Sequence, residues 1–286
     1  MTKPFDILQP KTRENCVVFA SPHSGRDYSD AFLNRTELPW EIIRSSEDAF
    51  VAELFDAAPE HGSPLLAARA PRAFVDLNRG PDELDPALIE GVRRPSHNPR
   101  IASGLGVIPR VVANGRPIYR GKLTLDEAHE RITTVWRPYH DQLRTLLDEA
   151  LNQFGQAVLI DCHSMPRDAL ETIGPRSGAL PDVVIGDRFG ASAGAPLVEH
   201  IEAAFAAAGL KVAKNMPFAG AFTCQQYGRP SRRIHAVQIE IDRSLYMDEA
   251  RIEPNDNFDN FKALISNVVK EICAFGRNET LPVAAE

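Results

Sequence analysis

The chain has 286 residues, 43% hydrophobic and 25% charged, which is ordinary globular usage and enough for one large α/β domain with a substantial core. The formal net charge of −7 and the lack of a basic stripe argue against nucleic acid as a partner. No run approaches the roughly 20 apolar residues of a membrane span, and the N-terminus lacks the apolar core of a signal peptide, so we expect no membrane partner and a cytoplasmic location.

Predicted strands and helices alternate along the chain. Strands are predicted at the apolar runs Cys16–Ser21, Ala73–Asp76, Ala157–Cys162, Asp182–Ile185 and Ala236–Ile241. Helices are predicted at Ser46–Ala58, Leu125–Phe154, Ala195–Ala208 and Asn257–Phe275, the second of them opened by a capping box of Thr124 and Glu127. This alternation predicts a single α/β domain over residues 1–286, with helices on both sides of its sheet. The Pro-, Gly- and Arg-rich stretch 81–121 is expected to be a long loop insertion that forms a lid or a wall of the active site.

Two of the predicted strands end alike, in a histidine followed by a serine. The runs "VVFASPHSG" and "AVLIDCHSMP" place His23 and His163 at the carboxyl ends of strands, where ligands of open α/β sheets usually bind. Alternation along the second strand puts Asp161 on the face of His163 and Cys162 on the other face. A metal-ligating histidine usually needs such a carboxylate partner, so the pattern favours a metal site over a Cys–His nucleophile. The alternative is a pair of polar strand ends without a ligand.

A catalytic zinc ion takes three protein ligands and leaves one position for water. The stretch "RSSEDAFVAELF" offers Asp48, or alternatively Glu47, as the third ligand. Both acids lie at a predicted helix start, where they would also favour the helix dipole without binding a metal. A set of two histidines and one carboxylate favours one Zn²⁺ ion, although cobalt, manganese and nickel also suit it.

Substrate binding is predicted after another apolar run, in "FVDLNRGPDELDP". Asn78 and Arg79 follow that run, and arginine can grip a carboxylate through two parallel hydrogen bonds. A surface arginine without a ligand is the alternative.

The last strong signal is "RIHAVQIEIDRSLYM", where apolar and polar residues alternate. Glu240 lies on the polar face, and an acid inside a buried strand is costly unless it is paired or functional. We therefore predict Glu240 as the general base that takes a proton from metal-bound water. His235 begins the same strand and is predicted to contact the substrate or the developing oxyanion, with a surface position as the alternative.

The remaining histidines and the cysteines carry weaker signals. His129, His140 and His200 lie on predicted helices and are expected to face solvent. The four cysteines, Cys16, Cys162, Cys224 and Cys273, include no C-x-x-C pair and are expected to be reduced thiols.

Taken together, these motifs resemble the N-formylglutamate amidohydrolase family. The resemblance runs in order through "SPHSG", "DLNRGPDELDP", "GLGVIPR", "YRGKLTLDEAHERI", "DCHSMP", "PDVVIGDR" and "HAVQIEIDRSLYM". This family is similar in turn to the zinc carboxypeptidase and aspartoacylase group. The resemblance implies a mixed central sheet of about eight strands flanked by helices, and one zinc ion held by His23, an acid and His163. Carboxypeptidase-like enzymes have an acidic ligand three residues after the first histidine, where this chain has Arg26, so the match of "EDAFVAELF" points to Asp48 instead.

The resemblance also implies an activity. We expect zinc-dependent hydrolysis of the amide bond of a small-molecule N-acyl acidic amino acid, foremost N-formyl-L-glutamate to formate and L-glutamate, as in histidine breakdown. Arg176 or Arg229 would hold the second carboxylate of that substrate. Two alternatives remain: a related zinc hydrolase for another N-acyl amino acid or small peptide, and a non-enzymatic α/β protein that binds a small carboxylate through Arg79.

Overall fold

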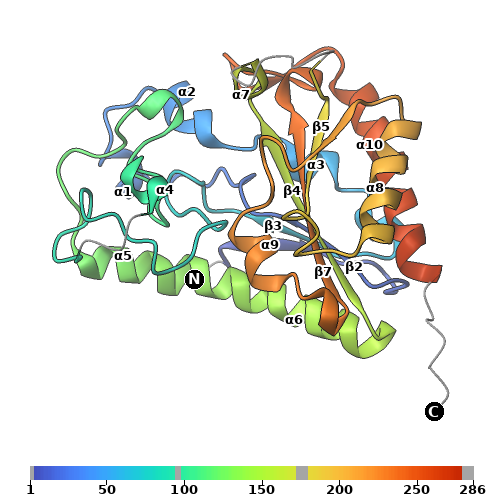
Figure 1. Cartoon of the computed structure of the whole chain (residues 1–286). Coiled ribbons are helices and arrows are strands. Elements are labelled where there is room, and N and C mark those ends of the chain that lie inside the picture. Colours follow the sequence, from blue (N-terminus) through green and yellow to red (C-terminus); the bar gives the residue numbers. More distant parts are fainter. Residues whose placement is uncertain (1–2, 94–97, 172–179, 279–286) are drawn as a thin grey trace.

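Seven strands form one mixed sheet in the computed structural model, which describes residues 3–93, 98–171 and 180–278 (Figure 1). Their spatial order is β1-β3-β2-β4-β7-β5-β6. The strands are β1 (Phe5–Leu8), β2 (Val17–Ser21), β3 (Leu65–Ala68), β4 (Ala157–Met165), β5 (Val183–Gly186), β6 (Val212–Lys214) and β7 (Ile234–Asp242). Strands β3, β2, β4 and β7 run parallel, β1 is antiparallel at one edge, and β5 is antiparallel to β7. A separate two-stranded sheet joins β8 (Met247–Asp248) to β9 (Glu253–Pro254).

The two long central strands determine where the functional residues meet. Strand β4 is buried along all of its nine residues, as expected of a strand covered on both faces. It pairs with β7 from Ala157↔Ile234 to Met165↔Asp242, and in this register His163 lies directly beside Glu240. The sheet therefore brings together two side chains that are far apart in the sequence.

Helices cover both faces of the sheet (Figure 1). One face packs against α3 (Val51–Leu54), α8 (Ala195–Ala207) and α10 (Phe258–Asn278). The other packs against one long helix, made of α5 (Leu125–Arg131), a π-helical segment (Ile132–Trp136) and α6 (Arg137–Phe154). Shorter helices are α1 (Asp30–Leu33), α2 (Trp40–Ile43), α4 (Pro99–Ala102), α7 (Arg167–Glu171) and α9 (Phe222–Tyr227). The expected mixed sheet between helices is thus confirmed, with seven main strands in place of about eight.

The capping box expected at the start of the long helix is also confirmed. Thr124 and Glu127 form the capping box at the start of α5, each side chain accepting a hydrogen bond from the other residue's backbone N–H. The four cysteines are buried free thiols. In the described part of the chain, no helix is long and apolar enough to cross a membrane.

Other expectations are wrong, for identifiable physical reasons. Residues Ala73–Asp76 form a turn instead of a strand, because the N–H groups of Phe74 and Val75 donate to the carbonyl of Pro71. The strand of this region is β3, which ends before that turn. The predicted helix Ser46–Ala58 shrinks to α3, because Phe50 has a φ of 66° and interrupts the helical backbone.

His140 is buried instead of exposed (2% exposed), because it lies on the inward face of α6. Its ring nitrogens there contact the hydroxyl of Tyr227 and the carbonyl of Leu77. Within the insertion 81–121, the described residues pack back onto the domain through Leu88, Ile89, Val107 and Ile108.

Candidate metal centre and active site

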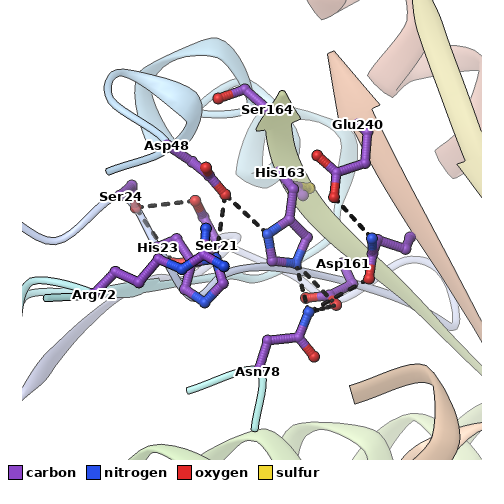
Figure 2. A network of polar contacts seen from close by, with 12 residues as sticks. Ser21, His23, Ser24, Asp48, Arg72, Asn78, Asp161, His163, Ser164 and Glu240 are labelled. Carbon is purple, nitrogen blue, oxygen red and sulfur yellow. Dashed lines mark hydrogen bonds and ion pairs between the residues drawn. The ribbon is translucent and has the colours of Figure 1, made fainter. Parts of the chain in front are cut away.

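Three buried side chains converge at the carboxyl edge of the sheet (Figure 2). His23 lies just after β2, His163 lies near the end of β4, and Asp48 reaches them from the loop before α3. One ligand atom from each residue lies within 4.8 Å of the others. Asp48 Oδ2 is 2.9 Å from His163 Nδ1 and 3.3 Å from His23 Nδ1. These atoms could hold one metal ion.

The outer nitrogen of each histidine faces a buried carboxylate. His23 Nε2 lies 2.7 Å from Asp76 Oδ1, and His163 Nε2 lies 3.0 Å from Asp161 Oδ2. An Nε2–H group that donates to a carboxylate leaves the Nδ1 lone pair directed at the shared centre. His23 Nδ1 is buried and has no hydrogen-bond partner of good geometry among the described residues. This is the pattern of metal-ligating histidines backed by carboxylates.

Asp48 is oriented from both sides. Its backbone N–H donates to the carbonyl of His23 at 2.9 Å, and its Oδ1 accepts from Arg243 Nη2 at 2.9 Å. Burial opposes the ionisation of Asp48, but the two histidine rings, whose Nδ1 atoms lie within 3.3 Å of its carboxylate, outweigh this and lower its pKa well below the usual range. Asp48 is therefore an anion at neutral pH, which is the form that binds metals.

Glu47, the alternative ligand, points away from the histidines. Its carboxylate accepts from Tyr28 at 2.6 Å and from Arg44 Nε at 3.0 Å. The geometry therefore favours Asp48 over Glu47.

Glu240 enters the same cavity from β7 (Figure 2). Its carboxylate is buried, and its Oε1 accepts a hydrogen bond from Gln238 Nε2 at 2.8 Å. Burial raises the pKa of Glu240 to about 7. A carboxylate with a pKa near the working pH is well suited to both accept and return a proton.

The cavity around these groups has a volume of ≈ 470 Å³. Besides the three candidate ligands and Glu240, its polar lining consists of Arg72, Asn78, Arg79, Arg100, Ser164, Gln238 and Arg243. The insertion 81–121 supplies Arg100 and Leu105, so its described part forms one wall of the cavity. Four arginines in one cavity of an acidic chain create a local environment for anions.

Asn78 and Arg79 both line this cavity, as their motif predicts. Asn78 Nδ2 lies 3.1 Å from His163 Nε2, and its Oδ1 accepts from the backbone and the hydroxyl of Thr223 at 2.8 and 2.9 Å. Arg79 donates from Nε to the carbonyl of Leu105 at 3.0 Å. Each side chain is therefore held by a segment distant in the sequence.

Two predicted substrate residues, His235 and Arg229, do not line the cavity. His235 lies at the opposite end of β7, beside Val158, and its Nδ1 accepts from the N–H of Gly194 at 3.0 Å. Arg229 is exposed and donates to the carbonyls of Gln225 and Gly228, both at 2.6 Å. Arg176 lies outside the described residues. The first residues of a parallel strand lie at the edge of the sheet away from the ligands, which explains why His235, the second residue of β7, cannot reach them.

Three residues that organise the site were not predicted from the sequence: Arg72, Asp76 and Arg243. Asp76 holds His23 and also accepts from Arg72 Nε at 3.1 Å, while Arg243 holds Asp48. Asp76 stands two residues before Asn78 in the same motif, and Arg243 directly follows the polar face of β7. Both positions could have been singled out as charged residues at the carboxyl ends of apolar runs.

Comparisons with known proteins agree with these motifs. The profile of the N-formylglutamate amidohydrolase family matches residues 15–247. The chain is 33% identical over 238 residues to an N-formylglutamate deformylase of Pseudomonas putida, covering 82% of each chain. It is 32% identical over 277 residues to an N-formylglutamate deformylase of Pseudomonas aeruginosa, covering 95% of this chain and 98% of that one.

Solved structures are similar as well. The N-formylglutamate amidohydrolase from Ralstonia eutropha has a TM-score of 0.90 at 35% identity, over 96% of this chain and 99% of that chain. A protein of Agrobacterium tumefaciens shares the fold, with a TM-score of 0.64 at 16% identity over 96% of both chains.

Proposed function

The chain belongs to the N-formylglutamate amidohydrolase family, and on this premise we propose that it is a zinc-dependent enzyme that hydrolyses N-formyl-L-glutamate to formate and L-glutamate. The observation that carries the proposal is the meeting, in one cavity, of a His–Asp–His set, a carboxylate with a pKa of about 7 and a group of arginines. Family membership supports the substrate, and the donor set supports the metal.

The residues present fit a zinc ion. His23 Nδ1, Asp48 Oδ2 and His163 Nδ1 would be its ligands, and two histidines with one carboxylate form a usual catalytic zinc set. The buried Nδ1 of His23, which has no hydrogen-bond partner of good geometry among the described residues, supports this assignment. When bound, zinc supplies a Lewis acid that lowers the pKa of a coordinated water toward about 7 and polarises a carbonyl group.

The chain's own groups would carry out the proton transfers. Glu240 would accept a proton from the attacking water and deliver it to the leaving amine of glutamate. Gln238 keeps the Glu240 carboxylate in one orientation through its 2.8 Å hydrogen bond. Arg72, held by Asp76 on the cavity wall, would donate to the formyl oxygen as negative charge develops there.

Substrate orientation falls to Asn78 and Arg79 in this proposal. The α-carboxylate of an N-formyl amino acid lies two bonds from the scissile nitrogen, so its receptor must stand close to the metal ligands. Asn78 contacts His163, and Arg79 is its neighbour on the cavity wall. An arginine and an amide together supply the donors that a carboxylate accepts.

A second candidate function rests on a neighbouring cavity of ≈ 440 Å³. It shares Arg72, Leu105, Pro166 and Arg243 with the first cavity, and its further wall includes Pro109, Val111 and Val112. An N-acyl group larger than formyl could extend along this apolar wall, which keeps hydrolysis of other N-acyl amino acids as the alternative. A purely carboxylate-binding protein is less favoured, because it gains nothing from the buried Glu240.

The wider setting follows from the same proposal. We place the enzyme in a reducing compartment such as the cytoplasm, because all four buried cysteines are free thiols. Release of glutamate from a formylated form would suit a late step of histidine degradation. One shared sheet supports treating residues 1–286 as a single domain.

Formate release from N-formyl-L-glutamate tests the proposal. We expect turnover by zinc-loaded protein, its loss after chelation, and its return when zinc is restored. A folded, zinc-loaded protein that releases no formate would contradict the substrate, and a panel of N-acyl amino acids would then test the second candidate. Full turnover in the presence of the chelator would contradict the metal.

A further inference from the structure

The four arginines of the cavity differ in their partners. Arg72 donates to Asp76, and Arg243 donates to Asp48, so the charge of each is balanced by a buried carboxylate. Arg79 donates to the carbonyls of Leu105 and Asn78. Within the part of the chain that the structure describes, neither Arg79 nor Arg100 forms an ion pair with a carboxylate. Of the four guanidinium groups, these two are therefore not held in a salt bridge by a described carboxylate.

Arg79 and Arg100 are close enough to repel each other. Burial lowers the pKa of the Arg79 guanidinium; the nearby charge of Asp76 opposes this, and the positive charges of Arg72 and Arg100 add to it. Unpaired like charges facing one cavity are unfavourable in the absence of an anion, and bound anions remove the penalty. A ligand with two negative charges would neutralise both.

The fold holds Arg100 in this position. It lies on α4, whose Ile101 is buried, and Asn98 caps the helix while also donating to Glu83 at 3.3 Å. Leu105 links the two arginines, because its N–H donates to the carbonyl of Arg100 at 2.8 Å and its own carbonyl accepts from Arg79 at 3.0 Å. The insertion therefore folds back so that Arg100 reaches the cavity beside Arg79.

We propose that Arg100 binds the distal side-chain carboxylate of the substrate and so makes the enzyme selective for N-formyl derivatives of dicarboxylic amino acids. This inference rests on the proposed function. Arg79 is buried next to Asn78 and takes the carboxylate nearer the metal ligands, whereas Arg100 is exposed at the cavity wall and takes the farther one. Arg100 fills the role that the sequence suggested for Arg176 or Arg229.

The test compares two substrates that differ only in the distal group. N-formyl-L-glutamine replaces the side-chain carboxylate of N-formyl-L-glutamate with a neutral amide of the same shape. For each enzyme, the ratio of kcat/KM for the glutamate compound to kcat/KM for the glutamine compound measures selectivity for the distal charge. We expect R100Q to lower this ratio about 10- to 100-fold, as loss of a charge-assisted hydrogen bond would. R100K should restore part of it.

R116Q is the matched control. Arg116 is an exposed arginine of the same insertion and does not line the cavity, so its replacement should leave the ratio unchanged. The assignment of Arg100 would be overturned if R100Q had the same ratio as wild type, which includes an equal fall of kcat/KM on both substrates. It would also be overturned if the wild-type enzyme did not distinguish the two substrates. Wild-type protein that hydrolyses neither compound would overturn the proposed function itself, which is a separate result.

Discussion

Two buried histidines differ in their surroundings: His163 lies in the candidate active-site cavity, and His140 lies in an aromatic cluster formed by Trp136, His140, Phe222 and Tyr227. In the cavity, His163 lies between Asp161 and Asp48; burial opposes its protonation, but these carboxylates outweigh burial and raise its pKa well above the ordinary value. In the aromatic cluster, His140 lies between the Tyr227 hydroxyl and the carbonyl of Leu77, both at 2.9 Å. Burial lowers the pKa of His140 to about 4.

The comparison teaches that burial alone does not mark a functional histidine. Both rings are almost fully buried (2–3% exposed), and both ring nitrogens of each histidine lie within hydrogen-bond or ion-pair distance of a partner. The difference is the charge of the partners, since carboxylates prepare an imidazole to face a cation and neutral groups do not. The cavity thus surrounds its histidines with charged partners. The aromatic cluster instead forms hydrogen bonds with the carbonyls of Leu77 and Arg79, on either side of Asn78.

The largest expected effect is in the cavity. Replacing Glu240 with glutamine keeps the shape but removes the proton acceptor, so kcat/KM should fall by about 10²- to 10⁴-fold, the range of general acid–base catalysis. Zinc content, measured by elemental analysis, should remain that of wild type. Wild-type turnover by E240Q would remove Glu240 from the mechanism.

The next effect is the dependence of stability on pH that the neutral surroundings of His140 predict. The folded-state pKa of His140 (about 4) lies below the ordinary value of 6.5, so the unfolded state binds more protons between these values. The contribution of His140 to the free energy of unfolding is therefore full above pH 6.5 and is lost as the pH falls toward 4, by up to about 3 kcal/mol. Urea unfolding across this range should show a smaller pH slope for H140Q than for wild type. H129Q, at an exposed position of the same long helix, should keep the wild-type slope.

A smaller effect tests the carboxylates behind the proposed metal ligands. D76N removes the charge that faces His23 Nε2, and loss of such a partner typically weakens metal binding by about 10- to 100-fold. Competition with a chromogenic zinc chelator measures this directly. D85N is the matched control, because Asp85 is buried and pairs with Arg110 outside the cavity. Equal zinc affinities for D76N and wild type would contradict the role of Asp76.

The smallest effect links the two regions. Trp136 Nε1 donates to the carbonyl of Arg79 at 2.9 Å, so W136F leaves that carbonyl without its partner. We expect a loss of about 1 kcal/mol in the free energy of unfolding and a several-fold rise in KM for N-formyl-L-glutamate at nearly constant kcat. W40F, at a half-exposed indole on α2, should change neither quantity. A fall in kcat without a rise in KM would show that the cluster does not act through Arg79.

Local residue patterns were enough to predict the elements whose form depends on neighbouring residues in the chain. Periodicity located β4, β7 and the three long helices, and strand alternation put Asp161 on the side of His163 and Glu240 opposite the apolar face. These inferences held because side-chain direction along a strand or helix is set by the backbone repeat. Local pattern could not predict the position of side chains whose contacts come from distant segments of the chain.

The pairing of the charged side chains, in contrast, depends on the folded arrangement of distant segments. The tertiary structure turned Asp48 toward the histidines and Glu47 toward Arg44, it put Asp76 behind His23, and it placed His235 at the wrong end of β7 for the cavity. It also folded the insertion back so that Arg100 joined Arg79. The physical reason is that these contacts follow from strand register and from turns that join distant segments, and neither is encoded in the spacing of residues within one segment.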